Sequence, residues 1–263
     1  MNENPRTGGQ TAGRQIRVAV VADVHFDGIR GPLRELFAEV RREADVLAIC
    51  GDLTTHGEEG QVRGFVEEMN GLDLPVVAVL GNHDHDADQV DEISAILRGR
   101  GIILLDGDNA VIEGVGFAGA TGFGGGFGRR TLGAFGEKIY KEFVQAGMDE
   151  ALKLETALKT LHTETRLVLL HYAPIPETLV GEPEQIFPFL GTSRLLPPID
   201  TYGADAVFHG HAHIGSPEGR TPGGTPVFNV ASMLLEKTIG RPFRIWTVPA
   251  PERRRAPTSP RAE

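Results

Sequence analysis

The chain has 263 residues, a length that suits one large α/β domain with a substantial core. With 26 basic and 36 acidic residues its formal net charge is −10, the wrong sign for a protein that holds a long nucleic acid by neutralising many phosphates. Hydrophobic residues make up 40% of the chain and mean hydropathy is −0.14. No apolar run approaches the ~18 residues of a membrane span, so we expect no membrane partner, and any phosphate chemistry must be local.

The sequence contains a single cysteine, Cys50, which excludes an intramolecular disulfide and a cysteine-rich zinc site. The first 15 residues lack an apolar segment, and we therefore expect no signal peptide. Both features are typical of the reducing cytoplasm, where we expect the protein. Residues 1–15 and 249–263 are polar and rich in Gly, Pro or Arg, so we expect two disordered tails around a domain of residues 16–248.

Short apolar runs alternate with helical patterns in the first half of the chain. Runs bounded by charged residues or Gly indicate strands buried on both faces at 16–22, 46–50 and 76–80. Apolar residues at helical spacing predict helices at 32–42, 60–69 and 87–97. The resulting order is βαβαβα.

Further strands are predicted at 102–105, 110–113 and 116–119, two of them joined by the turn of residues 106–109. A long helix at 137–162 follows, and then strands at 167–170, 206–208, 226–230 and 243–248. About ten short strands are too many for one open sheet, and we therefore expect two stacked sheets flanked by helices.

Five short polar motifs each follow a predicted strand. They are Asp23-Val24-His25, Gly51-Asp52, Gly81-Asn82-His83-Asp84, the lone His171 and Gly210-His211-Ala212-His213. Because the carboxyl ends of strands in α/β folds form the edge where ligands bind, these loops can converge. A single D-x-H or a lone strand-end His is weak evidence, but Asp, His and Asn in this order indicate a metal centre. Without a thiolate, the set suits Mn²⁺, Fe²⁺, Zn²⁺ or Ni²⁺.

In these motifs the chain resembles the calcineurin-like metallophosphoesterase superfamily, and the resemblance covers residues 16 to about 248. It implies an α/β fold, a four-layer α-β-β-α sandwich of two mixed β-sheets flanked by helices, with a dinuclear metal centre. It implies one metal held by Asp23, His25 and His213, a second held by Asn82, His171 and His211, and Asp52 as the bridge. His83 is then a phosphate contact or a general acid.

Elementary electrostatics favours the same chemistry. Two divalent cations bring a charge of +4 and the carboxylates of Asp23 and Asp52 remove 2, so the centre attracts a phosphoryl group without a basic surface. Metals about 3.5–4 Å apart can hold a bridging hydroxide as the nucleophile. Histidines titrate near neutrality, so His83 can protonate the departing alkoxide. We expect Mn²⁺ as the ion, with Fe²⁺, Zn²⁺ or Ni²⁺ as alternatives.

Motifs of other hydrolases are missing from the sequence. The C-x5-R loop of cysteine phosphatases would need Arg six residues after Cys50, where His56 stands, and neither G-x-S-x-G nor G-x-x-x-x-G-K-[ST] occurs. Protein Ser/Thr phosphatases of the superfamily carry G-D-x-V-D-R-G, but this chain has Thr55 and His56 in place of its second Asp and its Arg. The motif looks more like bacterial phosphodiesterase-type branches, and we therefore expect a small phosphodiester as substrate.

Three interpretations of function are kept open. A phosphomonoesterase or nuclease of the same superfamily is the alternative, whereas a non-enzymatic binding scaffold is disfavoured because every ligand position is filled. For substrate contacts we consider His56, Arg129 in the Gly-rich segment 122–130, and Arg194 in the Pro-rich segment 174–198. Each segment is either a rim of the substrate pocket or a plain surface loop.

Overall fold

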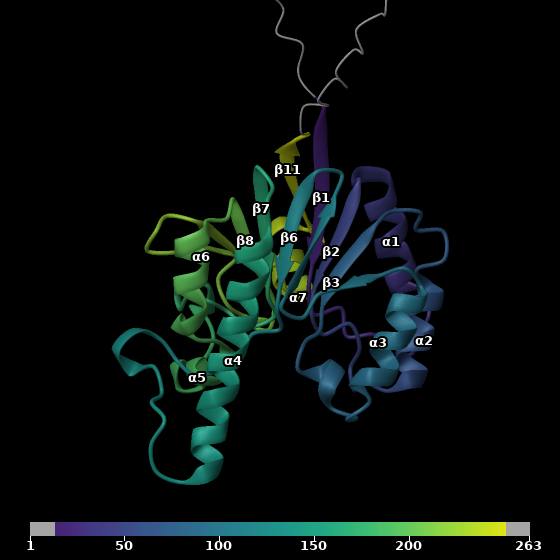
Figure 1. Ribbon diagram of the computed structural model, residues 1–263. Coiled ribbons are helices and arrows are strands. Elements are labelled where there is room, and N and C mark those ends of the chain that lie inside the picture. Colours follow the sequence, from purple (N-terminus) through teal and green to yellow (C-terminus); the bar gives the residue numbers. More distant parts are fainter. Residues whose placement is uncertain (1–13, 251–263) are drawn as a thin grey trace, which may run out of the picture.

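The computed structural model describes residues 14–250, which form two β-sheets stacked between two helical layers (Figure 1). The first sheet has the strand order β11-β1-β2-β3-β4 and the second β5-β6-β7-β8-β10-β9. Both are mixed, because β11 runs antiparallel to β1, and β5 and β9 run antiparallel to β6 and β10, while the other neighbours are parallel. The predicted four-layer α-β-β-α sandwich is confirmed.

The strands of the first sheet are β1 (Gln15–Val21), β2 (Val46–Cys50), β3 (Val76–Val79), β4 (Ile103–Leu104) and β11 (Arg244–Pro249). Those of the second are β5 (Asp108–Ile112), β6 (Val115–Gly119), β7 (Thr165–Leu169), β8 (Ala206–His209), β9 (Glu218–Arg220) and β10 (Pro226–Asn229). The helices beside the first sheet are α1 (Pro32–Glu43), α2 (Glu59–Glu68) and α3 (Val90–Gly99). Those beside the second are α4 (Lys138–Thr160), α5 (Phe187–Leu190) and α6 (Leu196–Tyr202), and α7 (Ser232–Ile239) leads from β10 to β11.

Successive residues of the central strands face different layers. In β1, Ala19 and Val21 pack against the helices α1–α3, whereas Val18 and Val20 pack between the two sheets. In the second sheet, Val168 of β7 packs against α4 and α6, and its neighbours in the strand face the first sheet. Strands buried on both faces must be apolar throughout, which is why the predicted runs contain no alternation of polar and apolar residues.

The predicted role of the turn at residues 106–109 in pairing two strands is wrong. This turn leads from β4, at the edge of the first sheet, to β5, at the edge of the second. The hairpin is formed instead by β5 and β6, and its turn residues Glu113 and Gly114 have φ of 53° and 83°. Two positive φ values are what a type I′ hairpin turn requires. The Asp106-Gly107 sequence therefore indicated a turn correctly, but it did not indicate which two strands pair.

The two predicted tails lie almost wholly outside the described residues. At their inner ends Gln15 pairs with Pro249 in the ladder of β1 and β11, so the strands extend one residue beyond 16–248 on each side. Within residues 14–250, the structure contains no helix of the length and hydropathy needed to cross a bilayer.

Candidate metal centre

The five polar motifs meet at the edge where the parallel strands of both sheets end. Two groups of side chains present ligand atoms that all lie within 4.8 Å of one another, and these are Asp23, His25, Asp52 and His213 in one group and Asp52, His171 and His211 in the other. Asp52 belongs to both groups, as expected of a bridging ligand. The remaining predicted ligand, Asn82, has its Oδ1 2.9 Å from His171 Nε2 and so lies beside the second group.

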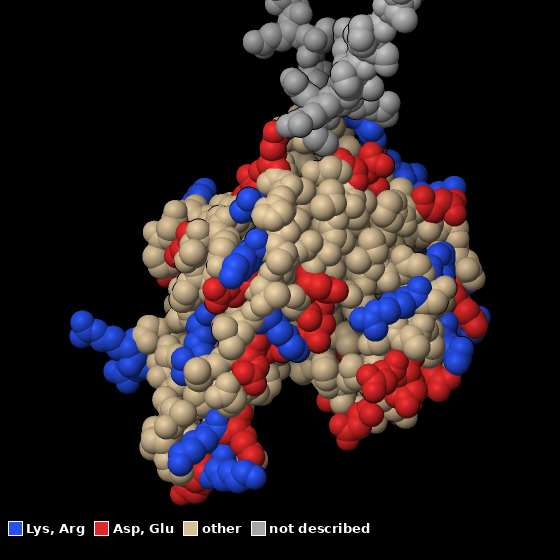
Figure 2. Space-filling model, viewed as in Figure 1, with Lys and Arg blue, Asp and Glu red and all other residues tan. Residues whose placement is uncertain are grey.

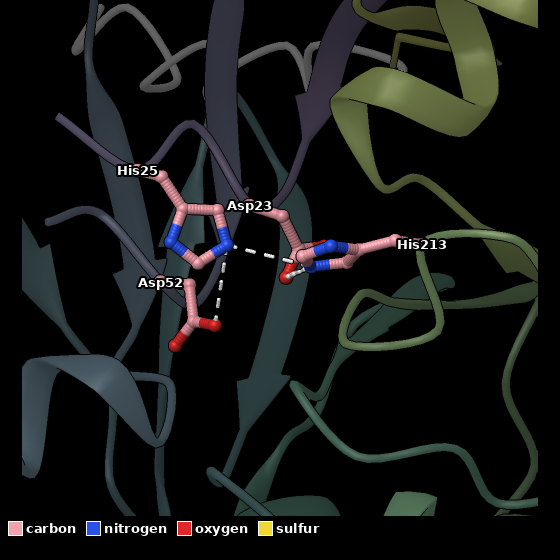
Figure 3. A group of neighbouring side chains, drawn as sticks. All are labelled: Asp23, His25, Asp52 and His213. Atoms are coloured by element: carbon pink, nitrogen blue, oxygen red, sulfur yellow. Dashed lines mark hydrogen bonds and ion pairs between the residues drawn. The ribbon is translucent and has the colours of Figure 1, made fainter. Parts of the chain in front are cut away.

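The first group is drawn from loops after β1, β2 and β8 (Figure 3). Nε2 of His213 lies 3.2 Å from Asp23 Oδ1 and 3.4 Å from Nε2 of His25. His25 Nε2 is in turn 3.7 Å from Asp52 Oδ2. His25 and His213 are 188 residues apart in the chain, so only the sheet edge brings them together. The side chains converge on one point, with the geometry of ligands around a cation.

The second group shows why a cation fits. His171 is fully buried, and its Nδ1 lies 3.0 Å from the carbonyl oxygen of Cys50, to which it donates. The Nε2 of the neutral ring is then a bare lone pair, yet it faces Asn82 Oδ1 at 2.9 Å and Asp52 Oδ1 at 3.4 Å. Three acceptors that face one another repel unless a proton or a metal cation lies among them, and a cation can serve all three at once. A backbone carbonyl that fixes the tautomer of a histidine is also the usual support of a metal ligand.

Ionisation of these groups is strongly perturbed by burial. Burial and then repulsion by Asp23 raise the pKa of Asp52 to about 9. Burial lowers the pKa of His171 to about 4 and that of His211 to about 3, which keeps both rings neutral and able to coordinate. Burial opposes the ionisation of Asp23 as well, but its hydrogen bond with His213 holds its pKa below the usual range. Divalent cations favour a deprotonated carboxylate and a neutral imidazole, so they match this donor set.

Backbone conformation at the centre is unusual. Four candidate ligands have left-handed backbone angles, with φ of 55° at Asp23, 42° at His25, 50° at Asp52 and 70° at His211. Residues with a side chain rarely adopt these angles, and such residues cluster at functional sites where the surrounding structure holds them. The backbone N–H of His211 donates to both carboxylate oxygens of Asp23, at 3.1 and 3.0 Å, and helps to hold the loop after β8.

The glycine that precedes a ligand in each of three motifs makes room for a ligand from another motif. A Cβ atom at Gly51 would lie 2.4 Å from Nδ1 of His171, and one at Gly210 would lie 2.4 Å from Oδ2 of Asp23. A Cβ atom at Gly81 would lie 2.1 Å from Oδ1 of Asp52. The close approach of candidate ligands thus explains why these three positions are occupied by glycine. The motifs alone did not reveal this reason.

Replacing Gly81 by Ala is expected to displace Asp52 and to remove at least one equivalent of metal. The added methyl group would also lie 2.3 Å from the backbone nitrogen of Asp52, so the two loops must separate, at a cost of about 1–3 kcal/mol in stability. Metal analysis and thermal unfolding measure both effects. Gly60→Ala is the matched control, because no atom lies within 4 Å of a Cβ there, and alanine within a helix stabilises by about 0.5–1 kcal/mol. A Gly81→Ala protein with its full metal content would contradict this explanation.

A family model described as calcineurin-like phosphoesterase matches residues 16–215, more than half of the chain, and all five motifs lie within this range. This chain belongs to the calcineurin-like phosphoesterase family. The resemblance noted in the five motifs is thereby confirmed, and the protein is a phosphoester hydrolase of a family that depends on a dinuclear metal centre. No curated protein matches the sequence significantly.

Two solved structures share the fold of this phosphoesterase over nearly its whole length. Phosphopantetheinyl hydrolase from Mycobacterium tuberculosis superposes with a TM-score of 0.64 at 12% identity, covering 93% of this chain and 100% of its own. The protein TT1561 of Thermus thermophilus gives a TM-score of 0.54 at 15% identity, covering 90% of this chain and 100% of its own. At these identities the likeness extends to the fold alone.

The phosphoesterase motif G-N-H-D contains a residue to which the sequence had assigned no role. Asp84 is buried, and its carboxylate accepts hydrogen bonds from the backbone nitrogens of Gly81, Leu53 and Thr54 and from the hydroxyl of Thr54. Burial raises the pKa of this carboxyl despite the four donors. Asp84 therefore joins the loops after β2 and β3, which carry the candidate ligands Asp52 and Asn82. An acidic residue directly after His83 in the motif was the only signal in the sequence.

His83 lies beside the metal centre and points one ring nitrogen away from it. Its Nδ1 lies 2.9 Å from the carbonyl oxygen of Thr55 and 3.2 Å from Oδ2 of Asp86. Its ring contacts that of His25 edge-on, with centroids 4.9 Å apart. The sequence lacks the orienting Asp of protein phosphatases because Thr55 stands at that position. In the structure the backbone carbonyl of Thr55 and the carboxylate of Asp86 both lie within reach of Nδ1 as acceptors.

The three predicted substrate contacts lie in different surroundings. His56 is exposed, and its backbone nitrogen donates to Gln61. Arg129 is exposed in a single 3-10 turn, and Arg194 donates to the carbonyl oxygen of Leu132. None of the three lines either of the two cavities that include Asn82. Their contact with substrate stays a prediction.

Cys50 plays no catalytic part in this geometry. It is fully buried at the end of β2, and burial raises the pKa of its thiol well above the usual value. The thiol therefore stays protonated, and its backbone carbonyl is what serves the site, as the acceptor for His171.

Proposed function

We propose that this phosphoesterase hydrolyses a small phosphodiester at a centre of two divalent metal ions. The observation that carries the proposal is the position of Asp52, whose carboxylate belongs to both donor groups. The first metal would be held by Asp23, His25 and His213, the second by Asn82, His171 and His211, with Asp52 shared. When bound, two such ions supply positive charge for the phosphoryl oxygens and lower the pKa of water towards neutrality.

The identity of the ions follows from the donor atoms. Carboxylate and amide oxygens together with imidazole nitrogens suit Mn²⁺, and Fe²⁺, Zn²⁺ or Ni²⁺ are alternatives with the same preference. No thiolate lies in either donor group, which argues against a closed structural zinc site.

His83 would act on the substrate rather than on the metals. Its Nδ1 is occupied by Thr55 and Asp86, so the ring can hold a proton on Nε2 and give it to the departing alkoxide. The backbone nitrogen of His83 donates to Oδ1 of Asp52 at 2.9 Å and so fixes the distance of the ring from the centre.

The charges around the site favour a monoanionic substrate. A cavity of about 650 Å³ extends from Asn82 between α3 and α4, and Figure 2 shows the molecule hollowed between its two lower lobes. Its lining contains four acidic residues, Asp91, Asp106, Asp149 and Glu150, and two basic ones, Arg98 and Lys153. Lys153 is already paired with Asp106 at 2.8 Å and with Glu150 at 2.7 Å. A diester carries one negative charge fewer than a monoester dianion and meets less repulsion here.

Long nucleic acids and phosphoproteins fit this surface poorly. On the face in Figure 2, basic and acidic residues alternate and form no continuous basic track. The net charge of −10 also disfavours the binding of a long polyanion. We propose a free small molecule as the partner and, from the single buried cysteine, the cytoplasm as its compartment.

A substrate panel tests the proposal. With saturating Mn²⁺, kcat/KM is compared for a cyclic nucleotide, an aryl phosphodiester, an aryl phosphomonoester, a phosphopeptide and single-stranded DNA. We expect one of the two diesters to rank first. If the monoester ranks first, the protein is a phosphomonoesterase, and if the phosphopeptide or the DNA does, the interpretation of the surface is wrong.

A further inference from the structure

A row of aromatic rings leads from a candidate metal ligand to the surface. The ring of Tyr172 lies 4.5 Å from that of His211 and 5.9 Å from Phe123, measured between centroids. Phe123 lies 5.0 Å from Phe143 of α4, and Phe143 lies 6.4 Å from Phe189 of α5. Each spacing is within the range of about 4.5–7 Å at which aromatic rings attract one another. The row therefore forms a continuous wall that begins at the metal centre.

This wall encloses a second cavity, of about 430 Å³, which we name the aromatic subsite. It is lined by Phe123, Phe143, Phe189, Tyr172 and the aliphatic side chains of Ile186 and Leu190, and its lining also includes the candidate ligands Asn82 and His211. No acidic or permanently charged side chain is among its described lining residues. In this the aromatic subsite differs from the acidic cavity, whose lining also includes Asn82.

The wall is built by contacts between segments far apart in the chain. The backbone nitrogens of Gly125 and Gly126 donate to the carbonyl oxygens of Pro188 and Gly191, at 2.6 and 2.9 Å. A Cβ atom at Gly124 would lie 2.6 Å from that Pro188 oxygen, so the glycine allows the loop to approach α5. The sequence left each of the segments 122–130 and 174–198 as either a rim of the substrate pocket or a surface loop. In the structure the two segments are joined by hydrogen bonds.

The same wall is tied to the metal centre. His211 Nε2 lies 3.2 Å from the carbonyl oxygen of Phe189 and donates a hydrogen bond to it. The other ring nitrogen, Nδ1, is then the one that can coordinate a metal. The side chain of Phe189, by contrast, is 60% exposed. A large aromatic ring left in water beside a catalytic centre gains stability when a ligand covers it, and concave apolar walls of this size are typical of ligand sites.

We propose that the aromatic subsite binds a planar, uncharged aromatic ring that is part of one of the alcohols esterified to the phosphorus of the substrate. This inference rests on the proposed phosphodiesterase function and names the part of the substrate that sets specificity. Rings surround the cavity, so a planar ring can make stacked or edge-on contacts that an aliphatic group of similar size cannot. The lining offers no charged group to a second phosphate. The ring would belong to a nucleoside or to a simple aryl alcohol.

The test uses three anions of equal charge that hydrolysis does not cleave, because both of their substituents are joined to phosphorus by carbon. They are dimethylphosphinate, cyclohexyl(methyl)phosphinate and methyl(phenyl)phosphinate, titrated calorimetrically into the metal-loaded protein. We expect the phenyl compound to bind at least about tenfold more tightly than the dimethyl compound, and more tightly than the cyclohexyl compound, because the ring buries apolar surface and adds aromatic contacts. Displacement of the phenyl compound by adenosine or by benzyl alcohol then identifies the source of the ring.

Variants of the wall complete the experiment. Phe143→Leu and Phe189→Leu keep apolar bulk but remove a ring, and we expect the phenyl preference to fall to about threefold or less while metal content is unchanged. Phe189 is exposed, so its variant retains the fold even if that of Phe143 does not. Phe135→Leu is the matched control, because Phe135 is 68% exposed, contacts Tyr140 and does not line the subsite.

The outcomes separate the two proposals. Equal binding of the phenyl and cyclohexyl compounds, or an undiminished phenyl preference in both wall variants, would overturn the aromatic subsite and leave the diesterase function standing. If none of the three phosphinates binds while a phosphomonoester is hydrolysed, the proposed phosphodiester substrate is wrong and the subsite falls with it.

Discussion

The Asp52→Asn protein is expected to lose at least one equivalent of divalent metal and nearly all hydrolytic activity. An amide cannot supply the negative charge that both donor groups share at this position. Losing a metal removes several kcal/mol of transition-state stabilisation, so kcat/KM should fall by at least about 10³-fold. Metal analysis after gel filtration and kinetics with an aryl phosphodiester measure the two effects.

Asp73→Asn is the control for this substitution, because Asp73 is 75% exposed and pairs with Arg41 away from the centre. It should keep both metals and full activity. Two bound metals and persistent activity in the Asp52→Asn protein would show that another residue bridges the ions.

The same variant is expected to be the more stable protein once metal has been stripped from both. In the folded wild type the pKa of Asp52 is about 9, far above its value of about 3.9 in an unfolded chain. The folded state then holds a proton that the unfolded state releases, so wild-type stability falls as pH rises from about 4 to 9. Asparagine does not titrate, and the advantage of the variant should therefore be larger at pH 8 than at pH 5. Thermal unfolding in chelator at the two pH values checks the sign, and a gap that shrinks with rising pH would contradict it.

The His83→Ala protein is expected to keep both metals and to lose between about 10² and 10⁴ in rate, the range typical of general acid–base catalysis. Its side chain belongs to neither donor group, and its free Nε2 is available to a leaving oxygen. A smaller loss on esters with good leaving groups is the signature of acid catalysis, because such groups depart without a proton. Equal losses on all esters would instead identify His83 as a phosphate contact.

Two further variants make the result specific. His162→Ala, at an exposed residue just after α4, should be unchanged in rate and in metal content. Asp86→Ala removes one of the two acceptors of His83 Nδ1 and should give a smaller loss than His83→Ala, because the carbonyl of Thr55 still orients the ring. Loss of metal from the His83→Ala protein would contradict both roles assigned to this residue.

The strands and the candidate ligands could be predicted from sequence because their physical causes are local. A strand covered on both faces must be apolar throughout, and the runs at 46–50 and 76–80 show this without reference to any partner. Ligand residues must carry a donor atom and must follow a strand to reach the common edge, and Asp52 and His171 meet both conditions within a few residues of sequence.

The sequence by itself therefore determined the class of fold, the motifs and the kind of chemistry they support. What the tertiary structure decided depends on residues that meet only after folding. The hairpin of β5 and β6 was hidden because pairing depends on which sheet each strand joins. Phe189 lies in one cavity with His211 because glycines at 124–126 let two distant segments hydrogen-bond, and no local pattern records such a contact. Asp86 likewise contacts the ring of His83 only because the turn after β3 brings the Asp86 carboxylate back towards that ring. No sequence motif indicates this contact.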